Sequence, residues 1–269
     1  MRTNKAIYGA FACSLSALVF SYYGNSALGA ESPSAGASQF EDLVRQGEAA
    51  DAQFNPEKAL QFYLKASCEH PKDPQVLLKV AKEYSDSTIT IADPVESRHR
   101  IEKALRYAER AAELDPGSAV ALLSQAICYG KLGEYSGTRD KIEYARLVKD
   151  YADRALAIDP DYAYAHDILG QWEFEVAALG RTKRLLVTLV FGGLPPASTE
   201  ESVHQLERAV QLEPNAATHR LGLGFAYLAN GEPAKARRSF EMVMAMPCKE
   251  IYDSDCHQRA ERAIANLQI

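Results

Sequence analysis

The residues of this sequence that could carry out chemistry are its six histidines, five cysteines and 36 acidic residues. His166 and His219 occupy equivalent places in two neighbouring helical segments, so a shared metal or proton-transfer site is one interpretation. Two packed amphipathic side chains explain the same placement more simply. The sequence contains no Walker loop, no HExxH motif and no GxSxG motif. We therefore expect a protein that is not an enzyme, with no catalytic residue, no bound metal and no cofactor.

Two cysteines lie close enough in the sequence to close a short covalent loop. Cys248 and Cys256 flank a polar stretch, and a disulfide between them is an alternative to two free thiols. Cys68 and Cys128 fall on apolar helix faces, where cysteine behaves as a small buried hydrophobe. The spacing of Cys248, Cys256 and His257 does not fit a structural zinc site.

A segment that combines cations with apolar residues is the most unusual part of the chain. Arg181, Lys183 and Arg184 precede a mostly apolar run that continues to Leu194. Cations beside apolar residues suit an amphipathic segment, so these three side chains are candidate contacts for an anionic head group. The alternative is a buried extra helix with its cations in water. Trp172, the only tryptophan, precedes this segment and is more typical of a core anchor than of a ligand-stacking residue.

A repeat of short helices must position these side chains. Four Ala-rich stretches end in an acid or histidine followed by proline, at His70-Pro71, Asp115-Pro116, Asp159-Pro160 and Glu213-Pro214. Counting from each proline predicts a first helix that starts three residues later, with a small residue at one shared place: Gly47, Ala81, Ala126, Gly170 and Gly224. Second helices carry small residues at two places seven positions apart, which lie on one helix face and let neighbours approach. These are Ala59, Ala104, Ser202 and Ala236, then Ala66, Ala111, Ala155 and Ala209.

This periodicity predicts an all-α, tetratricopeptide-like α-solenoid of about five helix pairs. The intervals between successive prolines are 45, 44 and 54 residues, which exceed the repeat of about 34 and predict inserted segments. Second helices are expected to restart at Asp93-Pro94 and at the capping box that begins with Ser198. A helix at about Asp253 to Gln268 is expected to cap the array.

In a solenoid of this kind the first helices line a concave groove. The C-terminal half of the groove is predicted to be apolar and to bind a partner or ligand through Val120, Leu123, Ile127, Tyr164, Phe174, Leu221, Phe225 and Leu228. The first two units place charged residues there instead, namely Glu41, Glu48, Asp51, Lys82 and Asp86.

The N-terminus has the layout of a secretory signal peptide. Arg2 and Lys5 precede an apolar run over residues 6–23, and small residues follow up to Ala30. Residues 1–30 are therefore predicted to be a signal peptide, residues 31–39 a flexible lead-in, and residues 40–269 the helical repeat domain. This organisation predicts an exported protein, periplasmic or extracellular. The alternative is an uncleaved membrane anchor formed by residues 6–23.

Residues from about 126 to 267 resemble the regulator of microtubule dynamics family. The resemblance is carried by GKLGEYSGTRDKI (Gly130 to Ile142), ILGQWEFEVA (Ile168 to Ala177) and FGGLPPASTEESV (Phe191 to Val203). It implies a tetratricopeptide fold, a non-enzymatic role, and a link to microtubules and organelle membrane contacts. An export signal would separate the domain from cytoplasmic tubulin.

The net charge is -6, from 30 basic and 36 acidic residues, which disfavours nucleic acid as a partner. We expect an exported scaffold that binds a protein or peptide in its groove. The alternative is a carrier or sensor of a hydrophobic ligand such as a phospholipid. Membrane contact would come through an uncleaved N-terminus or through the insert at residues 181–194.

Overall fold

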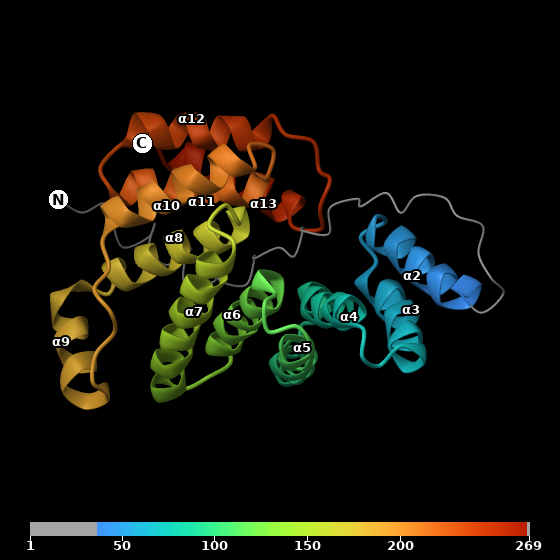
Figure 1. The fold of residues 1–269 in the computed structure, drawn as a ribbon. Helices are drawn as coiled ribbons and strands as arrows, with labels where there is room; N and C mark the ends of the chain where they lie inside the picture. Colours follow the sequence, from blue (N-terminus) through green and yellow to red (C-terminus); the bar gives the residue numbers. More distant parts are fainter. Residues whose placement is uncertain (1–36, 268–269) are drawn as a thin grey trace. The chain divides into compact units, whose positions relative to one another are not determined.

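The computed structural model describes residues 37–267, which form α-helices, one short 3-10 helix and connecting loops (Figure 1). Twelve α-helices lie in this range, as five pairs with α9 inserted in the fourth pair and α13 after the last. The predicted all-α class and pair number are confirmed. The first helices are α2 (Ala37–Asp51), α4 (Pro74–Asp86), α6 (Ala119–Glu134), α8 (Ala163–Ala178) and α11 (Ala217–Ala229). Their partners are α3 (Pro56–Glu69), α5 (Pro94–Leu114), α7 (Thr138–Ile158), α10 (Thr199–Leu212) and α12 (Pro233–Met244), with α9 (Gly180–Phe191) and α13 (Asp253–Asn266) outside the pairs.

Helix starts follow from capping residues and prolines. All four first helices after a repeat proline begin three residues beyond it, as predicted. The Asp93 carboxylate accepts the Val95 N–H at 3.0 Å, and the Ser198 hydroxyl accepts the Glu201 N–H at 3.0 Å. Side chains of this type satisfy N–H groups that have no partner inside the helix. Both predicted restarts of second helices are confirmed.

The described residues form two compact parts, residues 37–128 and residues 129–267, and α6 runs across the division. In the N-terminal part, Tyr63 packs with Ala50, Ala59, Leu60 and Val80. A second cluster of this part joins α4, α5 and α6 through Leu77, Leu78, Ala111 and Ala121. The predicted small residues of the second helices are all completely buried where these contacts form, because a larger side chain would hold the helices apart.

The C-terminal part has one large core that joins α8, α10, α11, α12 and α13. The core contains Phe225 and Phe240, whose rings meet edge to face with centroids 5.0 Å apart. Helix α13 contributes Cys256, Ala260 and Ala263, so the predicted capping helix covers the end of the last pair.

The extra residues of the long repeats are used in two ways. Helices α5 and α7 each have 21 residues, whereas α3 and α10 have 14. The first two long intervals therefore lengthen second helices and add the 3-10 turn Ser87–Thr90. Only the third interval holds a separate inserted helix, α9, followed by the irregular connection 192–198.

The N-terminal predictions lie mostly outside the described residues. Helix α2 begins at Ala37, within the predicted lead-in of residues 31–39. The predicted signal peptide and the alternative anchor at residues 6–23 both lie outside the described range. Within that range no helix combines the length and the apolar character needed to cross a bilayer.

Candidate functional site

The insert α9 exposes a continuous apolar face. Leu185, Leu186, Leu189 and Val190 have 60, 61, 75 and 59% of their surface exposed. Residues three or four apart share one side of a helix, so these four form a single strip, called here the α9 apolar face. The opposite side carries Arg184, Val187 and Phe191, which are all partly buried. The predicted alternative of a fully buried extra helix is therefore wrong.

Polar contacts hold α9 at both ends. The Arg184 guanidinium donates to the carbonyl oxygen of Val176 at 3.0 Å and to that of Ala197 at 3.1 Å. At the other end, Arg146 of α7 donates to the carbonyl oxygens of Phe191 and Gly193, the latter at 2.6 Å. Charged donors on carbonyl groups at a helix end are favourable. The structure thus gives Arg184 a positioning role that its prediction as a head-group contact did not include.

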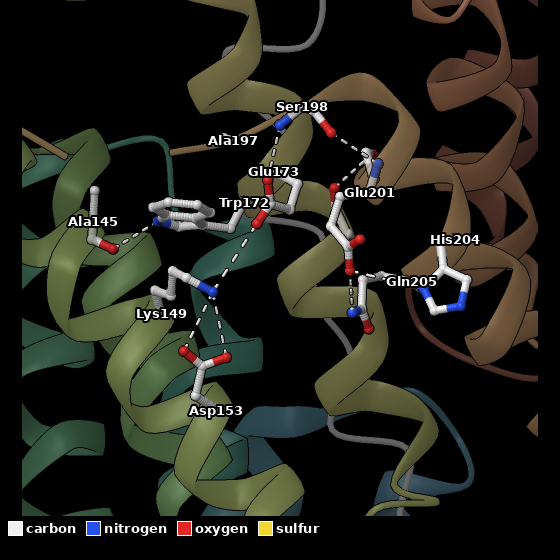
Figure 2. A network of polar contacts seen from close by, with 12 residues as sticks. Ala145, Lys149, Asp153, Trp172, Glu173, Ala197, Ser198, Glu201, His204 and Gln205 are labelled. Atoms are coloured by element: carbon white, nitrogen blue, oxygen red, sulfur yellow. Dashed lines mark hydrogen bonds and ion pairs between the residues drawn. The ribbon is translucent and has the colours of Figure 1, made fainter. Parts of the chain in front are cut away.

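The connection after α9 is fixed by a network around α8 (Figure 2). The Trp172 indole N–H donates to the Ala145 carbonyl at 2.7 Å, and the side chain is 1% exposed, so Trp172 is a core anchor. The neighbouring Glu173 carboxylate accepts the Ser198 N–H at 3.0 Å. Lys149 lies 4.0 Å from Glu173 and also pairs with Asp153 at 3.2 Å. These contacts tie α7 and α8 to the start of α10.

The environment of Glu173 has opposing effects on its charge. Burial raises the pKa of this carboxyl group above its ordinary value, whereas the Ser198 N–H and Lys149 favour the ionised form. In three of the other first helices a tyrosine occupies the equivalent position. Glu173 therefore has no aromatic ring to pack. Its carboxylate instead binds the backbone of Ser198, where the chain enters α10.

The eight predicted groove residues lie mostly inside the fold. Leu123, Ile127, Tyr164, Phe174, Leu221 and Phe225 are buried, whereas Val120 and Leu228 are partly exposed. Within the C-terminal part, the first helices α8 and α11 are adjacent. Helix α8 carries Tyr164 and Phe174, and α11 carries Leu221, Phe225 and Leu228. Their role in binding stays a prediction.

Three of the five charged positions predicted for the first two units, Asp51, Lys82 and Asp86, come together. The Lys82 ammonium lies 2.7 Å from Asp51, 3.1 Å from Glu83 and 3.0 Å from Asp86. Burial raises the pKa of Glu83 to about 8; Lys82 opposes this rise, and Asp86 and Asp51 add to it. The sequence analysis did not single out Glu83, because adjacent residues on a helix do not normally face one partner.

The two histidines singled out by position have separate partners. His166 contacts Gln205 at 2.6 Å and the Pro160 carbonyl at 2.9 Å. His219 is completely buried, lies 3.4 Å from Asp167, and meets the Tyr164 ring edge-on at 4.6 Å. Both therefore have packing roles, in line with the simpler interpretation. Within residues 37–267 no group of three potential ligands could hold a metal ion.

Of the two alternatives for Cys248 and Cys256, a disulfide or two free thiols, the structure has the free thiols. Cys256 lies on the inner side of α13, among Phe240, Val243 and Ala260 of the core. Cys248 is exposed before the helix, with its sulfur 3.8 Å from His257 Nδ1. Burial raises the pKa of the Cys256 thiol well above its ordinary value, which disfavours the thiolate form that reacts.

Comparison with known proteins gives one family. The sequence pattern of the family described as regulator of microtubule dynamics protein 1-3 matches residues 40–268. Regulator of microtubule dynamics protein 1 of Bos taurus is 28% identical over 192 residues, which are 71% of this chain and 60% of that protein. The human protein 1 is 29% identical over 134 residues, 49% of this chain and 43% of its own length. The chain thus matches about two fifths to three fifths of the length of these relatives.

One solved structure shows the same fold. A thermophilic tetratricopeptide-repeat protein of Thermus thermophilus matches with a TM-score of 0.62 at 19% identity. The match covers 84% of this chain and 99% of that chain. At this identity the likeness concerns the fold alone, and it confirms the tetratricopeptide-like class.

Proposed function

Since the chain belongs to the regulator of microtubule dynamics protein 1-3 family, we propose that it is a non-enzymatic scaffold that binds a protein or peptide through its first helices. The observation that carries this proposal is the common register of α2, α4, α6, α8 and α11, in which a small residue recurs at one shared place. The four of these helices that follow a repeat proline also start alike. Repeated helix pairs of this kind present one side of successive first helices as a binding surface. Fold alone does not name the partner.

A site-specific crosslinking experiment tests the first-helix surface. Leu228 lies on a first helix and is partly exposed, so a photoreactive amino acid there would report a partner. Met242 on the second helix α12 is 47% exposed and gives the matched control position. We expect a discrete adduct from position 228 and none from position 242. Adducts of equal yield from both positions, or from neither, would contradict the proposal.

Export belongs to the same proposal and rests on the sequence of residues 1–30. The charged start, the apolar run and the small residues around Ala30 support cleavage after Gly29 or Ala30. N-terminal sequencing of the protein from its native compartment should then find Ala30 or Glu31 first. A chain that keeps Met1 and remains in the cytoplasm would contradict export. A cytoplasmic chain would also have access to microtubules, to which the names of the relatives refer.

A hydrophobic ligand is the second candidate. It is favoured by the apolar cluster that α8 and α11 share, which contains Phe174 and Phe225 and ends at the partly exposed Leu228. Native mass spectrometry of the full chain should then show a reproducible excess mass equal to a lipid. Leu228→Asp, at the partly exposed edge of this group, should reduce it. An unmodified mass in wild-type protein purified without detergent would contradict this function.

A further inference from the structure

We propose that α9 docks this protein on the surface of an anionic lipid bilayer, with the α9 apolar face inserted among the lipids. The proposal adds a membrane contact to the protein-binding function and does not depend on it.

The apolar face does not serve the folding of the protein. Helix α9 is held by Arg184, Arg146 and the partly buried Val187 and Phe191, all on the side away from that face or at the helix ends. In the C-terminal part, α9 lies apart from the stacked pairs, beyond the end of α8 (Figure 1). Large exposed apolar strips on a protein commonly mark interaction sites. Because the polar contacts fix the helix in advance, little conformational entropy is lost on docking.

The charge of this segment complements an anionic surface. No acidic residue occurs between Glu175 and Glu200, although the whole chain carries 36 acids and a net charge of -6. Within that stretch lie Arg181, Lys183 and Arg184. By the helix register, position 183 falls on one border of the α9 apolar face, and Lys183 is exposed there. A basic border beside an apolar face is the pattern of helices that lie in the plane of a membrane interface.

The dimensions favour a bilayer over a protein partner. Twelve residues make a helix of about 18 Å, which is too short to span the hydrocarbon core. Four side chains on one short helix also provide far less than the roughly 1,000 Å² that a stable protein interface buries. Insertion to a depth of about 5–10 Å, by contrast, needs only one such face.

A tryptophan introduced into the apolar face tests the proposal directly. Leu189→Trp in the full chain adds an exposed indole, whereas the native Trp172 is 1% exposed and hydrogen-bonded in the core. Vesicles of phosphatidylglycerol with brominated phosphatidylcholine should shift the fluorescence emission of the introduced tryptophan to shorter wavelength. The bromine atoms of the lipid should also quench this fluorescence. Because the signal comes from position 189, it reports insertion of α9 even if the N-terminus also binds the vesicles.

Charge variants in the Leu189→Trp background separate lipid electrostatics from other causes. Lys183→Glu should weaken the vesicle binding that the quenching reports by at least about fivefold. Each cation near an anionic surface contributes about that factor to the binding affinity. Lys72→Glu, an exposed cation in the loop before α4, is the control for net charge and should leave the quenching unchanged. Val95→Trp, at a 74% exposed position of α5, should show no quenching.

Three results would overturn the proposal. The first is an emission spectrum of the Leu189→Trp variant that anionic vesicles leave unshifted. The second is equal quenching by vesicles of zwitterionic lipid alone, with no effect of Lys183→Glu. The third is a shift that appears without vesicles and grows with protein concentration, which would assign the apolar face to a second copy of this chain. Each result leaves the crosslinking test at Leu228 unaffected, so the two proposals can fail separately.

Discussion

At the scale of single residues, small side chains decide how closely the helices pack. A Cβ atom added at Gly224 would lie 2.4 Å from Phe240 Cε1, and one added at Gly47 would lie 2.4 Å from Tyr63 Cε1. Both aromatic rings are almost completely buried, so neither has space to move. Glycine at these positions is therefore required by a close approach of two helices, and its unfavourable effect on helix propensity is outweighed.

Gly224→Ala should lower the free energy of unfolding by about 1–3 kcal/mol, because the Phe240 ring would be forced from its site. Gly133→Ala in α6 is the matched control, since an added Cβ there meets nothing within 4 Å. Alanine generally stabilises a helix relative to glycine, so Gly133→Ala should leave the free energy unchanged or slightly raised. Urea unfolding of both variants measures the difference. Equal losses in the two would show that close packing at Gly224 is not the cause.

The Lys82 cluster predicts a pH dependence of stability. One ammonium group faces three carboxyl groups, and Glu83, the most buried of them, has its pKa raised to about 8. The folded protein therefore holds this proton where the unfolded chain, with an ordinary glutamate, has released it. The resulting stabilisation is complete below about pH 4 and is lost as the pH rises through 8, with a slope of up to about 1.4 kcal/mol per pH unit.

Glu83→Gln should remove most of that slope, because the amide stays neutral throughout. The measurement is urea unfolding at several pH values from about 5 to 8.5, which brackets the loss of the proton. Glu113→Gln is the control, since this carboxylate on α5 is 65% exposed and pairs only with Arg110 in the described contacts. Parallel pH profiles for wild type and Glu83→Gln would show that Glu83 does not carry the proton.

At the scale of elements, α9 depends on contacts made by other helices. Its own sequence offers no N-terminal side-chain cap, and its end is set by Gly192, whose φ is +81°. Glycine adopts this left-handed conformation without steric cost. Arg146 of α7 then binds the carbonyl oxygens that α9 leaves unsatisfied at this end. The placement of the insert is thus decided by a residue 45 positions before Phe191.

Arg146→Met should release the C-terminal end of α9 while the rest of the fold stays intact. Loss of a charged hydrogen-bond donor should cost about 1.5–3 kcal/mol locally. Hydrogen exchange over residues 180–193 should accelerate, and trypsin should cleave sooner after Arg181, Lys183 or Arg184. Arg139→Met, an exposed arginine in the first turn of α7, is the control. Unchanged exchange in Arg146→Met would mean that Val187 and Phe191 alone hold the helix.

At the scale of the whole molecule, each helix pair contacts mainly its neighbours. Within each part, the extensive contacts join successive helices, such as α3 with α4 and α10 with α11. In repeat proteins of this kind, stability is close to a sum of local terms and terms between nearest neighbours. A defect in one repeat should therefore remain local.

Hydrogen exchange of two equivalent variants measures this locality. Gly224→Ala should accelerate exchange in α11 and α12 and leave α2–α4 unchanged. Gly47→Ala, which introduces the same 2.4 Å contact in the first pair, should accelerate α2 and α3 and leave α11 and α12 unchanged. Acceleration of both regions by either variant would show that residues 37–267 unfold as one cooperative unit.

The repeat, the helix starts, the buried small residues and the resemblance to a family could all be predicted from the amino-acid sequence. These features depend on local rules, since proline and capping residues begin helices wherever they occur and small residues repeat with the helix period. The motifs in α6–α7 and α8 are similar enough to the family for the resemblance to be recognised from the sequence. The family pattern matches residues 40–268, so the similarity extends over the whole repeat domain.

The contacts of the insert and of the charged residues became visible only in the folded protein. Arg184, Glu173 and Lys82 look like solvated surface charges in the sequence, yet each contacts groups that come from other elements. Cys256 falls on the inner face of α13, and this placement separates it from Cys248. The physical reason is common to all of them. A side chain's partners are set by which faces of distant helices meet, and local spacing does not contain that information.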